Sequence, residues 1–134
     1  MPLQSSRKPS KTSMNTEDRK MCVLVVDDDV KILRFLHSSL RLAGYEVVTT
    51  TSGEEALELV ESKNPNVMVL DILMSPLDGF EVLSRLRADS KLPVIAISAH
   101  ASSAEKALSL GANVFMAKPF RPDELIKRIE SVLK

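Results

Sequence analysis

Five short apolar runs recur along the chain from residue 21 onward, and they constrain the fold more than any other feature of the sequence. Most of these runs are β-branched and apolar at consecutive positions, which is typical of strands covered on both faces of a sheet. The segments between them place apolar residues at the spacing of amphipathic helices. The predicted strands are residues 22–26, 47–48, 67–70, 94–97 and 114–116.

Strands that alternate with helices in this way need right-handed crossovers, and they form a parallel sheet with helices on both faces. The sequence therefore predicts an α/β fold, a doubly wound five-stranded parallel sheet with five helices, in one domain over residues 21–134. A chain of 134 residues with 44% hydrophobic residues can fill one such core. The alternation itself leaves the order of the strands open.

The helical segments carry boundary signals. Gly44 is expected just beyond the end of the first helix, the third helix is expected to follow Gly79, and Pro122 suits the first position of the fifth helix. The second and fourth helices are expected to begin with Ser-x-x-Glu capping boxes. These two pairs are Ser52 with Glu55, and Ser102 with Glu105.

Residues 1–20 differ from the rest of the chain. They are rich in Ser, Lys, Pro and Thr and have too few apolar residues to bury surface, so we expect a disordered N-terminal tail. This tail carries five Lys and Arg against two Asp and Glu, a net charge of +3. Residues 21–134 carry 13 against 16, a net charge of −3. The folded part is therefore not expected to bind nucleic acid directly.

The location of the chain follows from simple features. No apolar run approaches the roughly 20 residues that span a membrane, and the N-terminus lacks the apolar segment of a secretory signal. The single cysteine, Cys22, excludes an intramolecular disulfide and is interpreted as a small buried residue of a strand. We therefore expect a cytoplasmic protein without membrane contact.

Polar residues follow four of the five predicted strands. Asp27 and Asp28 follow the first strand, Asp71 the third, Ser98 the fourth and Lys118 the fifth. Because sites in open α/β sheets form beyond the carboxyl ends of the strands, these side chains are expected to converge. The next residue, Asp29, is interpreted as a helix N-cap, since Asp after a strand often has that role.

Three carboxylates in one crevice need compensating charge. Two unit charges about 4 Å apart repel by roughly 4 kcal/mol at an effective dielectric constant near 20. Lys118 can supply one positive charge, and carboxylates with open water positions suit Mg²⁺. A carboxylate can also attack phosphorus to form an aspartyl-phosphate. Mg²⁺, Lys118 and the hydroxyl of Ser98 are then suited to hold the phosphoryl oxygens, and no histidine is required.

At this point the sequence resembles the receiver domains of two-component response regulators, from about residue 21 to residue 134. Each motif alone is weak, but five occur in order at the expected strand ends. They are Val25-Val26-Asp27-Asp28-Asp29, Val69-Leu70-Asp71-Ile72-Leu73-Met74, Asp78-Gly79-Phe80, Ile97-Ser98-Ala99 and Lys118-Pro119-Phe120.

The resemblance implies a flavodoxin-like fold with strand order 2-1-3-4-5. It also implies a phosphorylation site in which Asp71 is the phosphoacceptor. Mg²⁺ would then be bound directly by Asp28, largely through water by Asp27, and by Asp71 and the backbone carbonyl of Leu73.

The resemblance assigns further roles around this acceptor. Ser98 and Lys118 would contact the phosphoryl group, and the peptide bond from Lys118 to Pro119 would be cis. Phe115 lies where the family has an aromatic residue that moves inward when the hydroxyl residue is drawn to the phosphate. From its position alone, Phe115 is an apolar residue of an edge strand, and core packing is nearly as good an interpretation of it.

The sequence departs from the family pattern at two places. The proline that usually follows Met74 directly is displaced by one position, so that Ser75 precedes Pro76, which puts the path of this loop and the dephosphorylation rate in question. The fifth helix resembles that of receivers attached to winged-helix DNA-binding domains, by virtue of Phe120, Pro122, Glu124, Leu125 and Arg128. The acidic residues that pair across a dimer in that subfamily are replaced here by Asn113 and Val114.

The expected function is a phosphoacceptor signalling domain that receives a phosphoryl group from a histidine kinase or phosphotransfer protein. Its last helices would then act on a downstream effector, and a phosphorylation-dependent homodimer is compatible with the apolar fifth helix. The alternative is a pseudo-receiver, a protein-interaction module that phosphorylation does not regulate. An independent enzyme is not expected, because Leu73 stands where a phosphohydrolase of this type would place its acid–base residue.

Overall fold

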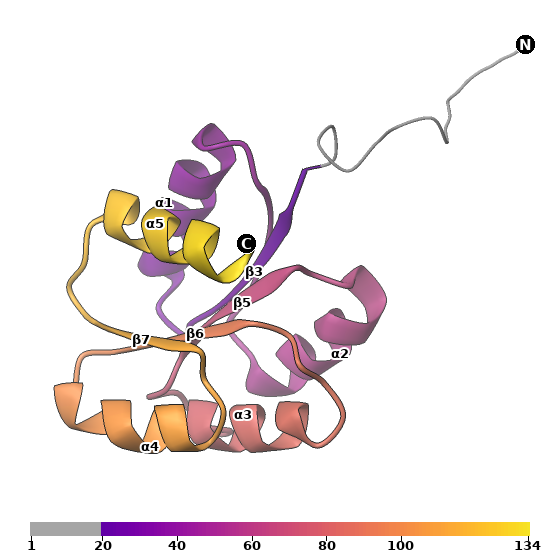
Figure 1. Ribbon diagram of the computed structural model, residues 1–134, viewed down its shortest axis with the longest axis vertical. Helices are drawn as coiled ribbons and strands as arrows, with labels where there is room; N and C mark the ends of the chain where they lie inside the picture. The colour runs from indigo at the N-terminus through magenta and orange to yellow at the C-terminus, as the bar shows by residue number, and fades with distance from the viewer. Residues whose placement is uncertain (1–19) are drawn as a thin grey trace, which may run out of the picture.

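The computed structural model describes residues 20–134, and it contains one parallel sheet flanked by helices (Figure 1). The tail expected over residues 1–20 lies outside the described residues, apart from Lys20. The strands are β3 (Cys22–Val26), β4 (Glu46–Thr50), β5 (Val67–Asp71), β6 (Val94–Ser98) and β7 (Val114–Ala117). The helices are α1 (Val30–Leu42), α2 (Gly53–Lys63), α3 (Gly79–Arg87), η2 (Ala101–Ser103, a 3₁₀ turn), α4 (Ala104–Ser109) and α5 (Pro122–Val132).

The sheet has the order β4-β3-β5-β6-β7, and every neighbouring pair is parallel. In chain order this is 2-1-3-4-5, so the flavodoxin-like fold and its strand order are confirmed. The order reverses at β3, which pairs with β4 on one side and with β5 on the other. The crevice at the carboxyl ends of β3 and β5 is therefore the topological switch point, where ligands bind in this class of fold.

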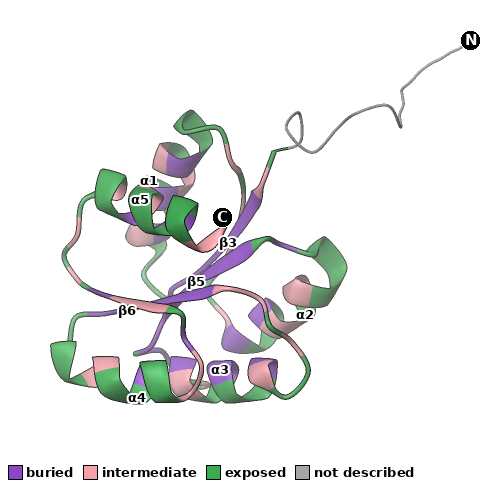
Figure 2. Ribbon diagram, in the orientation of Figure 1, coloured by how far each residue is buried: buried purple, intermediate pink, exposed green. Residues whose placement is uncertain are grey.

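Two hydrophobic layers hold the sheet. Helices α1 and α5 lie on one face of the sheet and α2, α3 and α4 on the other (Figure 1). Consecutive strand residues alternate between the layers: Val23 and Val25 pack with α1 and α5, whereas Leu24 and Val26 pack with the other three helices. All residues of β3, β5 and β6 are buried, as the purple strands of Figure 2 show. Strands covered on both faces explain why the apolar runs are continuous rather than alternating.

Some of the expected helix boundaries are confirmed. Gly44 has a φ of +100° just beyond the end of α1, a conformation that glycine adopts without steric cost. Pro122 is the first residue of α5, and the carboxylate of Glu124 accepts a hydrogen bond from the amide of Arg121 at 2.8 Å.

The two predicted capping boxes fared differently. The hydroxyl of Ser52 accepts a hydrogen bond from the amide of Glu55, but the Glu55 carboxylate accepts from the hydroxyl of Thr50 and leaves the Ser52 amide to Thr50 Oγ1. The box at Ser102 is wrong, because this residue lies inside the 3₁₀ turn and α4 begins later, at Ala104.

A helix with the length and apolar character needed to span a membrane is absent from residues 20–134.

Candidate functional site

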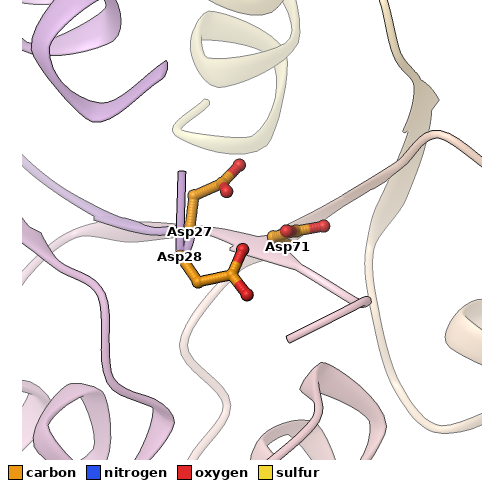
Figure 3. A group of neighbouring side chains, drawn as sticks. All are labelled: Asp27, Asp28 and Asp71. Carbon is orange, nitrogen blue, oxygen red and sulfur yellow. The ribbon is translucent and has the colours of Figure 1, made fainter. Parts of the chain in front are cut away.

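Three carboxylates meet at the carboxyl end of the central strands (Figure 3). Asp27 follows β3, Asp28 is the next residue, and Asp71 ends β5. Each offers a carboxylate oxygen, and these three oxygens lie within 4.8 Å of one another. Asp27 is 0% exposed and Asp71 is 3% exposed, whereas Asp28 faces solvent.

The register of the sheet brings these residues together. Val26 lies opposite Leu70 in the parallel ladder, so the residues that follow, Asp27 and Asp71, emerge side by side. Asp71 in turn lies opposite Ile97, and Ser98 follows at the end of β6. The convergence of strand ends that the sequence predicted is therefore a direct consequence of parallel pairing.

Lys118 supplies the positive charge of the cluster. Its ammonium nitrogen lies 2.9 Å from Oδ2 of Asp27 and 3.5 Å from Oδ2 of Asp71. The amide of Lys118 donates a 2.8 Å hydrogen bond to the carbonyl of Ser98, which fixes the start of the loop after β7. The peptide bonds that precede Pro119 and Pro76 are both cis.

The charges alter the acidity of these groups. Burial raises the pKa of Asp71 to about 6, and the negative charge of Asp27 adds to this rise, while Lys118 and the amide of Leu73 partly oppose it. Burial alone would lower the pKa of Lys118, but its hydrogen bond to Asp27 and the charges of both carboxylates raise that pKa above its ordinary value. One ammonium group therefore compensates the cluster only in part.

Backbone hydrogen bonds orient the carboxylates. Oδ1 of Asp27 accepts from the amide of Asp29 at 2.9 Å, and Oδ1 of Asp71 accepts from the amide of Leu73 at 3.3 Å. Asp29 caps α1, since its side chain accepts from the amide of Lys31, which confirms the interpretation of this third aspartate as an N-cap.

The loop after β5 packs closely against α3. Gly79 begins α3, and a Cβ atom there would lie 2.5 Å from the carbonyl oxygen of Asp71 and 2.6 Å from the Cα of Ile72. The amide of Gly79 donates to the carbonyl of Ile72 at 2.8 Å. Only glycine leaves room for this contact, so Gly79 allows α3 to begin directly against the backbone of Asp71. The sequence placed Gly79 before the third helix but gave no sign of this contact.

The other predicted site residues lie around the cluster. Ser98 is fully buried at the end of β6, and its hydroxyl accepts a hydrogen bond from the amide of His100 at 3.0 Å. Leu73 lies two residues beyond Asp71 and is exposed. Phe115 lies in β7, half-buried, and packs against the layer of α2, α3 and α4 rather than in the site.

The chemistry of the donor set fits a hard divalent cation. Three carboxylates face one ammonium group, and oxygen ligands of this kind, one of them exposed to water, are those that Mg²⁺ prefers.

A family profile described as the response regulator receiver domain matches residues 23–130. The chain belongs to this family. Receiver domains are signalling domains of two-component systems rather than enzymes in the usual sense, and they bind Mg²⁺ at an acidic pocket.

Known proteins similar to this receiver domain include transcriptional regulators. It is 44% identical over 120 residues to the probable transcriptional regulator ycf27 of Cyanophora paradoxa, covering 88% of this chain and 50% of that protein. It is 38% identical over 115 residues to the alkaline phosphatase synthesis regulatory protein PhoP of Bacillus subtilis, covering 84% of this chain and 48% of PhoP. The chain thus spans about half the length of the curated relatives it matches.

Solved structures agree with this assignment. The receiver domain of Francisella response regulator 1452 is 35% identical, with a TM-score of 0.80 over 85% of this chain and 97% of that one. The chemotaxis protein CheY4 of Vibrio cholerae is 30% identical, with a TM-score of 0.80 over 86% of this chain and 100% of CheY4.

Proposed function

We propose that this receiver domain accepts a phosphoryl group on Asp71 in a reaction that requires Mg²⁺, and that the phosphorylated form acts on a downstream effector. The observation that carries the proposal is the buried carboxylate of Asp71, which lies within 4.8 Å of two further carboxylates and 3.5 Å from the ammonium group of Lys118. A merely structural acidic residue would not need two like charges beside it.

The transfer makes and breaks one bond to phosphorus. A carboxylate oxygen of Asp71 forms a bond to the phosphorus of the donor, and the bond from phosphorus to the donor's leaving group breaks, with its electron pair leaving on that group. A pKa of about 6 leaves the carboxylate of Asp71 mostly ionised at neutral pH, as this attack requires. No proton has to be removed from the nucleophile.

The remaining residues of the site stabilise charge. Lys118, whose ammonium nitrogen lies 3.5 Å from Oδ2 of Asp71, would interact with one phosphoryl oxygen, and the hydroxyl of Ser98 would donate a hydrogen bond to another. Asp27, Asp28, Asp71 and the carbonyl of Leu73 would hold the Mg²⁺. When bound, this ion would neutralise the carboxylates and the oxygens of the incoming phosphoryl group.

A groove next to the site suits the protein that donates the phosphoryl group. This apolar groove, of about 180 Å³, lies between α1 and the loop after β7, and the exposed ring of Phe35 forms part of it. It is lined by Ile32, Phe35, Leu36, Lys118, Pro119 and Phe120. Because Lys118 belongs to both groove and site, a histidine kinase or phosphotransfer protein seated there would lie next to Asp71.

The response would begin at Ser98. Phosphorylation would draw its hydroxyl toward the phosphate, and the half-buried ring of Phe115 would move inward behind it. The surface formed by α4, β7 and α5 would then change and be recognised by an effector or by a second copy of the domain.

The first test is a measurement of intact mass. The chain is incubated with a small-molecule phosphodonor, with and without Mg²⁺, beside an Asp71→Ala variant. We expect the parent alone to gain one phosphoryl group, and only with Mg²⁺. No gain under any condition would refute the proposal and favour a pseudo-receiver that binds partners without phosphorylation.

A second variant tests the response. Ser98→Ala should still be phosphorylated on Asp71 but should no longer change the surface of α4, β7 and α5. Backbone amide chemical shifts on these elements, recorded before and after phosphorylation, report the change. If the amide chemical shifts of Ser98→Ala changed on phosphorylation as much as those of the parent, the proposed switch would be contradicted. The proposed phosphorylation of Asp71 would still stand.

A further inference from the structure

Arg87, the last residue of α3, joins three segments at the end of the sheet opposite the carboxylates. Its guanidinium donates to the carbonyl of Gly111 from Nε at 3.1 Å and from Nη2 at 2.9 Å. Nη1 donates to the carbonyl of Ser90 at 3.2 Å, and Nη2 also donates to Oδ1 of Asn113 at 3.1 Å. The acceptors belong to the turn after α3, the turn after α4 and the residue before β7.

The charge of Arg87 is held by dipoles rather than by a carboxylate. Over residues 20–134, no acidic side chain forms an ion pair with Arg87, and burial lowers the pKa of its guanidinium. The carbonyls of Ser90 and Gly111 follow the C-terminal ends of α3 and α4, where a helix carries partial negative charge. This cation therefore connects the end of α3 to the turns that follow α3 and α4.

Arg87 packs tightly against Gly111, and this contact is called the joint below. Gly111 has a φ of +111°, and a Cβ atom there would lie 2.9 Å from Cγ and from Nε of Arg87. Asn113 extends the joint to β6, because its Oδ1 also accepts from the amide of Val94 at 2.8 Å. Asn113 thus links the guanidinium of Arg87 to the first residue of β6.

The rest of α4 is loosely held. Ala107 is the one buried residue of this helix, Leu108 is 47% exposed, and no side chain caps its first turn. The ammonium group of Lys106 lies 4.4 Å from the centroid of the Phe80 ring, an exposed type of contact worth little. The chain before α4 leads back through η2 to Ser98, so one end of α4 connects to the site and the other to Arg87.

We propose that Arg87 is the positioning residue that fixes the C-terminal end of α4. A displacement that begins at Ser98 would then turn α4 about a fixed joint at Gly111 instead of shifting the whole helix, and it would reach β7 through that joint. This inference rests on the proposed function, because phosphorylation of Asp71 supplies the displacement.

The test is amide hydrogen exchange of the full chain, with intact mass recording the fraction phosphorylated by a small phosphodonor and Mg²⁺. In the parent, phosphorylation should change exchange over residues 101–107 but leave the amides of Gly111 and Ala112 unchanged. These two amides donate to the carbonyls of Leu108 and Ala107 and report on the end of α4. Arg87→Met keeps the apolar stem of the side chain and removes its donors.

In Arg87→Met we expect the Gly111 and Ala112 amides to exchange about tenfold faster before phosphorylation, since several hydrogen bonds are lost. Phosphorylation should then change their exchange further. Arg87→Lys, which keeps the charge but not the fork of donors, should be intermediate, and it carries the test if Arg87→Met does not fold. Lys106→Met is the matched control and should leave both amides as in the parent.

Two results would overturn the role of Arg87. One is unchanged exchange of Gly111 and Ala112 in unphosphorylated Arg87→Met. The other is faster exchange in that state with a phosphorylation-induced change still confined to residues 101–107, which would indicate a purely structural contact. A parent that gains no phosphoryl group would refute the proposed function, and the unphosphorylated comparison would still decide whether Arg87 fixes the joint.

Discussion

The two ends of the sheet differ in how completely their polar and charged side chains are paired. At the amino end, asparagine side chains pair with strand backbones: Oδ1 of Asn66 accepts from the amide of Cys22, and the amide of Asn66 donates to the carbonyl of Cys22, both at 2.8 Å. Asn113 forms the same reciprocal pair with Val94. Polar groups satisfied in this way favour a single stable arrangement.

The carboxyl end leaves its charges incompletely compensated. Asp27 and Asp71 are both buried, the pKa of Asp71 is raised to about 6, and Lys118 is the ammonium group that pairs with them among residues 20–134. Such a site gains most from a ligand that brings positive charge. The amino end of the sheet has polar groups paired for stability, whereas the carboxyl end keeps uncompensated negative charge that favours the binding of a cation.

The largest expected effect is that of removing Lys118. In Lys118→Met, phosphorylation from a small donor should slow by about 100-fold, because the transferred group loses a cation that stabilises its developing charge. The rate of mass gain measures this effect, and Lys127→Met on the exposed face of α5 is the control. A rate within about threefold of the parent would show that Lys118 serves the folded structure and not the reaction.

The second prediction concerns pH. The pKa of Asp71 is about 6 in the folded chain and near 3.8 when unperturbed, so between these values the folded state retains a proton that the unfolded state releases. The free energy of unfolding therefore falls as pH rises through this window, by about 3 kcal/mol in full. The Asp71→Asn variant has no carboxyl group at this position, so its free energy of unfolding should not show this decrease.

Urea titrations in a metal chelator measure the effect. The stability of Asp71→Asn relative to the parent should grow by about 2 kcal/mol from pH 4.5 to pH 7.5. Asp123→Asn is the control: a hydrogen bond from Arg121 lowers the pKa of Asp123, so that group titrates below this range. A constant difference between Asp71→Asn and the parent would mean that burial does not hinder ionisation of Asp71.

The third prediction is stabilisation by Mg²⁺. At a free concentration about ten times its dissociation constant, Mg²⁺ should raise the free energy of unfolding by about 1.4 kcal/mol. Asp28→Asn should need more Mg²⁺ for the same gain, since it removes the exposed carboxylate of the cluster. An equal response of parent and Asp28→Asn across a Mg²⁺ titration would place the ion elsewhere.

Much of this architecture could be predicted from local sequence. The five strands follow from continuous apolar runs, and the end of α1 from Gly44. The convergence of Asp27, Asp71 and Lys118 follows from the parallel direction of the strands. The strand order did not follow from spacing, since crossovers of similar length permit several orders, and it came from the resemblance to receiver domains.

The sequence did not predict the contacts between segments that are far apart along the chain. Arg87 and Gly111 are 24 positions apart, and an arginine at the end of a helix has no local feature that predicts its acceptor. The start of α4 was misplaced because a 3₁₀ turn and an α-helix share the same serine-rich beginning. Glu55 fits the capping pattern at Ser52, but its carboxylate accepts a hydrogen bond from the hydroxyl of Thr50 instead of from the Ser52 amide.

The smallest expected effect is at the amino end and tests whether the two ends are independent. Asn66→Ala removes the acceptor for the Cys22 amide, and the free energy of unfolding should fall by about 1 kcal/mol. The rate of phosphorylation should stay that of the parent, because the strand ends at the site keep their pairing. Ser62→Ala, on the exposed face of α2, is the control for stability. A slower phosphorylation in folded Asn66→Ala would mean that β3 transmits its position to Asp27, and the contrast between a stable end and a reactive end would no longer hold.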